Sequence, residues 1–151
     1  DLADRAVALH PNSVRVRYRV GAVYAVCGEP DKAIAQCEAA IRMTPLASKK
    51  AATATFSTWS CALYFAGRFE DCIHTGRRAL ALAPQEMIAR KYVAMSLAQL
   101  GRSREAKSEI AELVKRQADA SIALFQLQGF RHKWMHDLHV EGLRKAGLRE
   151  E

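Results

Sequence analysis

The sequence predicts an all-α protein, a right-handed superhelix of antiparallel helix pairs with about nine helices. Alanine and leucine dominate a chain that is 50% hydrophobic and only 7% aromatic, which favours helix over sheet. Gly67 follows Gly28 by 39 residues (67 − 28), and Gly101 follows Gly67 by 34 (101 − 67). Prolines recur at the same two intervals: Pro11, Pro45 and Pro84. Two markers thus share a period of 34 residues with one five-residue insertion, which is typical of helical repeats.

The residue pattern of each repeat unit predicts two helices, joined by a turn at its glycine. Residues 14–26 place apolar side chains at helical spacing, and Gly28 supplies the left-handed residue that commonly ends a helix. Asp31 can either cap the second helix or lie in its first turn, and Pro45 stops that helix. The same second helix recurs at two further places, residues 69–82 and 103–115.

The repeat register divides the chain into five consecutive parts. They are the second helix of a truncated preceding repeat (1–13), three repeats (14–47, 48–86 and 87–120) and a C-terminal pair of helices (121–151). We expect the C-terminal pair to cap the open end of the superhelix, because a terminal repeat needs a polar outer face. The five-residue insertion falls at the start of the second repeat.

The insertion predicts a longer helix and not a longer loop. Ser48 is a good N-cap and no helix breaker follows it, so we expect a helix from about Ser48 to Ala66. Such a helix extends past its neighbours by about one turn, roughly 5 Å. We expect its protruding end to flank a binding groove and to offer Lys49 and Lys50 to an acidic partner. Within the helix, Trp59 takes a large hydrophobic position and is predicted to be core.

The charge pattern favours solvated helix faces over a nucleic-acid or membrane surface. The net charge is +7 and the pI about 9.5, but lysine and arginine are scattered among aspartate and glutamate. A basic helical repeat that binds nucleic acid stays open as an alternative, because a basic balance also fits that function. The longest uncharged run, residues 51–67, is too short and too polar for membrane insertion.

The sequence contains no motif for catalysis or for cofactor binding. No glycine-rich phosphate loop, GxSxG, HExxH or CxxC pattern occurs. The chain is therefore expected not to be an enzyme and to need no cofactor. Its four cysteines fit reduced thiols in a cytoplasmic protein, and Cys37 and Cys72 lie on apolar helix stripes as small core residues.

Three histidines near the C-terminus are a candidate metal site. His132, His136 and His139 follow the spacing i, i+4, i+7, which places three imidazoles on one face of a helix. Imidazoles at this spacing can bind zinc, but no Cys, Asp or Glu on that face offers an obvious fourth ligand. Packed or solvated histidines are therefore favoured over a zinc site.

The repeat unit resembles the tetratricopeptide repeat, whose pattern is W-x2-L-G-x2-Y, then A-x3-F, then P. The corresponding residues of the first unit are Arg17, Val20, Gly21, Tyr24, Ala33, Cys37 and Pro45. Those of the second are Phe56, Trp59, Ser60, Leu63, Cys72, Gly76 and Pro84. Those of the third are Arg90, Val93, Ala94, Leu97, Ala106, Ile110 and Ala118. No unit fits the pattern at every position.

The resemblance implies a concave groove, lined by the first helix of each repeat, that binds a protein or a peptide. The groove positions of this sequence are Arg15, Tyr18, Arg19, Tyr64, Lys91, Tyr92, Met95 and Gln99. Aromatic side chains beside cations suit such a surface. Chaperone-binding repeats of this family clamp a C-terminal carboxylate with Lys and Asn, but Tyr18 and Ala22 take those places here. The expected partner is a protein or peptide, or a second copy in a homodimer, bound without that clamp.

A narrower resemblance covers essentially the whole chain. Residues 64–70, 78–84 and 98–102 resemble the C-terminal repeat region of bacterial, rhizobial-type class III adenylate/guanylate cyclases. Residues 141–148 resemble the terminal segment of those proteins. This resemblance implies a signalling parent with a catalytic domain upstream and a regulatory or scaffolding role for this chain. Winged-helix transcriptional regulators carry similar repeats and are the alternative parent.

Overall fold

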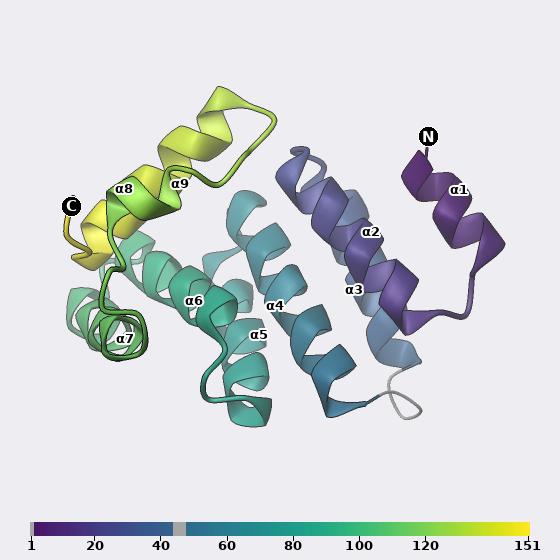
Figure 1. The fold of residues 1–151 in the computed structure, drawn as a ribbon, viewed down its shortest axis with the longest axis horizontal. Coiled ribbons are helices and arrows are strands. Elements are labelled where there is room, and N and C mark those ends of the chain that lie inside the picture. The colour runs from purple at the N-terminus through teal and green to yellow at the C-terminus, as the bar shows by residue number, and fades with distance from the viewer. Residues whose placement is uncertain (1, 44–47) are drawn as a thin grey trace.

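The structure, a computed structural model, describes residues 2–43 and 48–151 (Figure 1). Within these residues the chain forms nine helices and no strand, which confirms the predicted all-α fold. None of the nine is long and apolar enough to cross a membrane. They are α1 (Leu2–Leu9), α2 (Val14–Val26), α3 (Pro30–Arg42), α4 (Lys49–Phe65), α5 (Phe69–Leu82), α6 (Met87–Gln99), α7 (Ser103–Arg116), α8 (Ile122–Phe125) and α9 (Lys133–Ala146).

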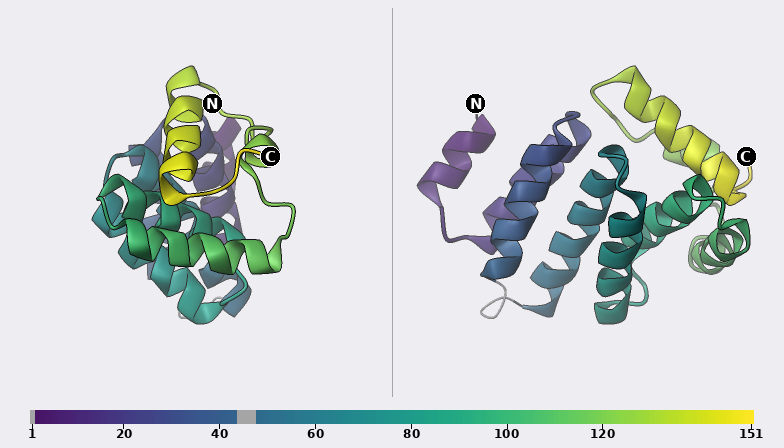
Figure 2. Two further views of the ribbon diagram at one scale, coloured as in Figure 1. Left: turned by 90° about the vertical axis from the view of Figure 1, so that its left-hand side faces the viewer. Right: turned by 180° about the vertical axis from the view of Figure 1, so that it is seen from behind.

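Six central helices form three antiparallel pairs, α2–α3, α4–α5 and α6–α7, which stack side by side (Figure 1 and Figure 2). The first helices of successive pairs are in contact, α2 with α4 and α4 with α6. Their inward residues therefore line a common face. At one end of the stack α1 packs on α2, and at the other α9 packs on α6 and α7.

Glycine ends the first helix of every pair, as the sequence predicts. Gly28, Gly67 and Gly101 have φ values of 80°, 72° and 75°, in the left-handed region that glycine enters without strain. The N–H of the residue after each glycine donates to the carbonyl five residues earlier, as Arg68 does to Leu63 at 2.9 Å. This shared geometry turns the chain back into the second helix of each pair.

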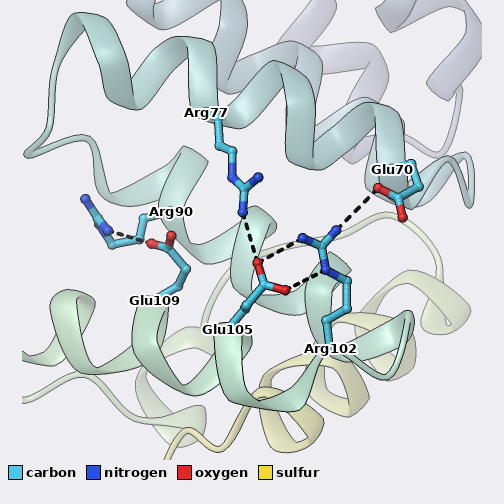
Figure 3. Close-up of polar contacts among 6 residues, drawn as sticks. All are labelled: Glu70, Arg77, Arg90, Arg102, Glu105 and Glu109. Carbon is cyan, nitrogen blue, oxygen red and sulfur yellow. Dashed lines mark hydrogen bonds and ion pairs between the residues drawn. The ribbon is translucent and has the colours of Figure 1, made fainter.

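Arg90 stands in the third repeat where the tetratricopeptide pattern has tryptophan. Its guanidinium donates to Glu109 Oε2 on α7 at 2.6 Å (Figure 3) and to the Pro84 carbonyl at 2.9 Å. Arg90 is only 8% exposed. Burial of this charge is tolerated because the Glu109 carboxylate pairs with it and both terminal nitrogens of the guanidinium form hydrogen bonds.

Arg17 occupies the same position in the first repeat and makes the same two contacts. It donates to the Pro11 carbonyl at 2.9 Å and to Gln36 Oε1 on α3 at 3.0 Å. In both repeats the partners lie 6 residues before and 19 residues after the arginine. The two arginines therefore occupy equivalent positions in their repeats. The acceptor on the second helix differs: it is Gln36 for Arg17 and Glu109 for Arg90.

Surface ion pairs join α5 to α7 (Figure 3). Glu105 lies 3.3 Å from Arg77 and 2.8 Å from Arg102, and Arg102 also lies 3.5 Å from Glu70. The Arg77 and Glu105 side chains are half exposed, so each such pair contributes only about 0–1 kcal/mol. Burial of apolar surface between the helices therefore contributes more to their packing than these charges do.

The longer helix predicted for the insertion is confirmed by α4. It has 17 residues, against 13 in α2 and 13 in α6. The Ser48 side chain accepts a hydrogen bond from the Ala51 N–H at 3.2 Å, which is the predicted N-cap. The extra residues lengthen the helix by about 6 Å at about 1.5 Å per residue. Pro45 and residues 46–47 lie outside the described residues.

The core is centred on α4 and α6, and Trp59 lies at its edge. The largest fully buried side chains include those of Tyr64, Tyr92 and Met95. Trp59 is only half-buried, which corrects the prediction that it is core. It packs against two buried clusters and stacks on Phe56, with ring centroids 6.4 Å apart.

Candidate partner-binding groove

The residues predicted to line the groove fall into two groups. One group lies on α2 and is accessible: Arg15 and Arg19, exposed, and Tyr18, half-buried. The other lies on α4 and α6: Tyr64, Lys91, Tyr92 and Met95, buried, and Gln99, half-buried. The groove is therefore open beside α2 and closed over α4 and α6, whereas the sequence predicts an accessible surface along its whole length.

The tail, residues 121–148, covers the closed part of the groove. Figure 1 shows α9 above α6, with its first turn directed toward α2. The Phe65 ring of α4 packs edge-on against Phe130 and Trp134, with centroids 5.1 Å and 6.0 Å away. The Arg131 N–H donates to the Val26 carbonyl at the end of α2 at 3.0 Å. The tail thus packs on the end of the stack and also reaches across its inward face.

Gly142 lets α9 approach the groove closely. A Cβ added there would overlap Tyr64 Oη and lie 3.1 Å from Met95 Cβ. The same tyrosine hydroxyl donates to the Leu138 carbonyl at 2.9 Å and accepts from Gln99 Nε2 at 3.3 Å. Burial also raises the pKa of Tyr64 above its ordinary value. In this arrangement Tyr64 binds the tail instead of facing a partner.

Lys91 is a buried cation beneath the tail, 5% exposed. Its ammonium donates to Gln128 Oε1 at 2.8 Å and lies 5.0 Å and 4.9 Å from the ring centres of Tyr92 and Phe125. No carboxylate of the described residues pairs with it. Burial lowers the pKa of Lys91 to about 8. A buried ammonium that lacks an anionic partner is complementary to an anion.

His139 is enclosed between aromatic rings under α9. Its ring centre lies 6.2 Å from that of Tyr92 and 5.1 Å from that of Phe130, and neither of its nitrogens has a hydrogen-bond partner. Burial, reinforced by the charges of Lys91 and His136, lowers the pKa of His139 to about 3. The tail therefore docks with polar groups left unsatisfied, which weakens its attachment.

The three tail histidines do not come together as a metal site. His132 precedes α9 and packs against Gly28, His136 is half-buried, and His139 is buried with its ring among aromatic side chains. The helix begins after His132, so the three imidazoles do not share one helical face. No group of three His, Cys, Asp or Glu in the described part of the chain is placed to hold a metal ion.

Exposed cations lie on α2 and at the start of α4. Arg15, Arg19, Lys49 and Lys50 form no ion pair within residues 2–43 and 48–151. Lys49 and Lys50 line an open pocket of about 670 Å³ between the start of α4 and the turn at residues 83–86. Arg15 lines a second open pocket, of about 660 Å³, between the starts of α2 and α4. The open groove is thus positively charged at its border.

The buried cysteines contribute to packing. Cys37, Cys61 and Cys72 are 0%, 7% and 0% exposed, which confirms the core position predicted for Cys37 and Cys72. Burial raises the pKa values of these thiols to about 12, 11 and 12, so they stay protonated and unreactive. The Cys72 thiol donates to the Ser60 carbonyl at 3.1 Å.

Comparison with known proteins places the fold among helical repeats. Residues 1–48 match the family model for the tetratricopeptide repeat. A variant of MamA is 25% identical with a TM-score of 0.62, over 77% of this chain and 64% of that one. A crystal structure of MamA is 18% identical with a TM-score of 0.68, over 95% and 82% of the two chains. YrrB, "a TPR protein with an unusual peptide-binding site", is 21% identical with a TM-score of 0.61, over 95% and 72%.

These similarities establish a tetratricopeptide-repeat-like helical solenoid. The chain spans 64% of the length of the MamA variant. No curated protein matches the sequence.

Proposed function

We propose that the chain is a non-catalytic interaction module that binds a protein or peptide segment in the open part of its groove. The observation that carries this proposal is the inward face of α2, where exposed Arg15 and Arg19 flank half-buried Tyr18. Arginine and tyrosine anchors carry much of the binding energy at protein interfaces. YrrB, a protein of similar fold, has a peptide-binding site, which supports a peptide as the ligand class.

An acidic segment is the partner that this surface favours. The chain carries a net charge of +7, and the cations at the border of the open groove have no carboxylate partner in the described structure. Complementary charge speeds association and weakens with added salt. Self-association into a homodimer is the second candidate, favoured by Leu2 and Leu9 on α1, which are 82% and 74% exposed. A dimer in sedimentation that Leu2→Glu with Leu9→Glu dissociates would support it.

Selection from a random peptide library against the whole chain tests the main proposal. Selected peptides should bind the Arg15→Glu/Arg19→Glu variant about tenfold more weakly or worse. The control variant Arg104→Glu/Arg116→Glu changes exposed arginines on α7, outside the groove, and should bind them with unchanged affinity. Equal binding to both variants, or a library that yields no peptide, contradicts the proposal. Steeply salt-dependent binding of DNA or RNA would instead favour the nucleic-acid alternative.

We also infer that the module regulates or scaffolds a nucleotide cyclase in the cytoplasm. The resemblance of residues 141–148 to the terminal segment of bacterial class III cyclases supports this parent. A cyclase domain upstream in the parent protein, with activity altered by Arg15→Glu/Arg19→Glu, is the expected finding. A winged-helix domain at that place would contradict it and favour a transcriptional regulator.

A further inference from the structure

The tail occupies the inward face of α4 and α6 as a bound segment would. It lies against Lys91, Tyr92 and Met95, which are buried, and it satisfies only some of the polar groups at this contact: Gln128 accepts from Lys91, and the Leu138 carbonyl accepts from Tyr64. Both nitrogens of His139 have no hydrogen-bond partner, and Lys91 meets no carboxylate among the described residues. The tail thus fits the shape of the groove, but it leaves the His139 nitrogens without hydrogen bonds and the Lys91 ammonium without a counter-charge.

We propose that the tail is a removable internal occupant of the groove, and that the partner to which it yields is a helical segment with an acidic side chain opposite Lys91. This inference rests on the proposed function and deepens it, because it names the chemistry of the partner. It extends the binding surface from the open part on α2 over α4 and α6.

The tail buries one apolar face, which includes Met135, Leu143 and Ala146, and exposes other apolar side chains. Trp134 and Leu127 are 45% and 81% exposed, so the tail leaves part of its own apolar surface in water. The contacts that define the pairs, such as Arg90 with Glu109 and the glycine turns, involve no residue of the tail. A terminal segment whose hydrogen bonds close no helix pair can open locally while the pairs stay folded.

The docked α9 shows what kind of segment fits. A helix lies against Tyr64 and Met95, with glycine at the point of closest approach. His139 lies near enough to Lys91 for the lysine charge to lower the pKa of the imidazole, so the two groups oppose each other when protonated. A carboxylate in place of His139 would instead pair with the buried ammonium. A desolvated ion pair of this kind gives a partner an advantage that the tail lacks.

Two fluorescent synthetic peptides of residues 131–148 test the acidic partner. One carries His139→Glu, and the matched control carries His139→Gln. The acidic peptide should bind the whole chain about tenfold more tightly or better, because it places a carboxylate beside Lys91. In the Lys91→Met variant this preference should vanish, while the control peptide still binds. Equal affinities in the unaltered chain, or a preference that survives Lys91→Met, overturn the acidic partner.

Two further measurements, peptide affinity in a Gly142 variant and hydrogen–deuterium exchange in α9, test whether the tail is displaced. Gly142→Val places a branched side chain where Tyr64 and Met95 lie, so it should release the tail and tighten binding of the acidic peptide about tenfold. In the unaltered chain, hydrogen–deuterium exchange should accelerate in the chain's own α9 when the peptide binds, and stay unchanged in α4 and α5. Binding without faster exchange in α9 overturns the displacement, whether or not Gly142→Val folds.

Failure of this inference is distinguishable from failure of the proposed function. Library peptides that depend on Arg15 and Arg19 but leave exchange in α9 unchanged would uphold the proposed function and overturn the inference. If no library peptide depends on these two arginines, the proposed function fails, whatever happens to α9.

Discussion

Lys91 lowers the stability of the folded chain, because burial strips water from an ammonium that no carboxylate in the described structure compensates. Methionine has a similar length and no charge to desolvate. Lys91→Met should therefore raise the free energy of unfolding at pH 7 by about 1–3 kcal/mol, measured by urea unfolding. The control Lys50→Met, at an exposed lysine, should change it by less than about 0.5 kcal/mol. A loss of stability in Lys91→Met would contradict this account of the site.

His139 makes stability depend on pH in mildly acidic solution. Its pKa is about 3 in the folded chain, against about 6.5 for an unfolded histidine. As the pH falls below 6.5, the unfolded state binds a proton that the folded state excludes, so the free energy of unfolding decreases until about pH 3. Lys91 does not make the free energy of unfolding depend on pH in this range. Below its pKa of about 8 it is protonated in both the folded and the unfolded chain.

Urea unfolding at pH 6.5 and pH 5.0 measures this effect. The free energy of unfolding should decrease by about 1–2 kcal/mol over this interval, at up to about 1.4 kcal/mol per pH unit. The His139→Leu variant should show no comparable decrease. The same slope in both proteins would show that another group is responsible.

Because Arg90 and Arg17 are equivalent, changing the acceptor of each arginine should change the free energy of unfolding in opposite directions. Glu109→Gln leaves buried Arg90 without a counter-charge and should lower the free energy of unfolding by about 1–3 kcal/mol. Gln36→Glu gives Arg17 the carboxylate that Arg90 has and should raise it by about 0.5–1 kcal/mol, because charged hydrogen bonds are stronger. Thermal unfolding of the two variants checks both. Changes of the same sign would mean that the two sites are not equivalent.

At the scale of the element, reversing the charges in the first turn of α4 should raise the stability of the chain and weaken partner binding. Lys49 and Lys50 oppose the positive end of the helix dipole, so Lys49→Glu with Lys50→Glu should raise the free energy of unfolding by about 0.3–1 kcal/mol per residue. The same change should weaken binding of a library-selected acidic peptide. Unchanged peptide affinity, measured by fluorescence anisotropy, would contradict a role for this end of α4 in partner binding.

Elements with strong local signals were predictable from the sequence. Each glycine at the end of a first helix takes a positive φ because a residue without a Cβ enters that region most readily, so the spacing of these glycines indicates the repeat directly. The start of α4 follows equally from Ser48 and the absence of a breaker after it. Local chemistry decides these features, and the residues that decide it lie within one turn of each other.

The position of the tail was not predictable in the same way. Helical spacing identifies residues 132–146 as a helix, but it does not say which surface that helix covers. Lys91 and Tyr92 occupy groove positions in the repeat register, and only contact with distant residues such as Phe125 and His139 buries them. The one local signal was Gly142, a small residue inside an amphipathic helix, which is typical of close approach between helices.

At the scale of the whole molecule, three stacked helix pairs create one inward face, and the chain covers part of that face itself (Figure 1). The open part on α2 is cationic and the covered part is aromatic with a buried lysine. Binding at the first part requires no rearrangement, whereas binding at the second requires the tail to leave. The position of the tail is therefore the central structural claim about this protein.

Proton–proton nuclear Overhauser effects in the unliganded whole chain test that claim most directly. Docking of α9 predicts cross-peaks from the Gly142 α-protons to the Met95 side chain and the Tyr64 ring, and from the His139 ring to Tyr92 and Phe130. Cross-peaks between α4 and α6 serve as the control that the repeats are folded. If these are present and all the α9 cross-peaks are absent, the claim is contradicted and the groove is open along its whole length.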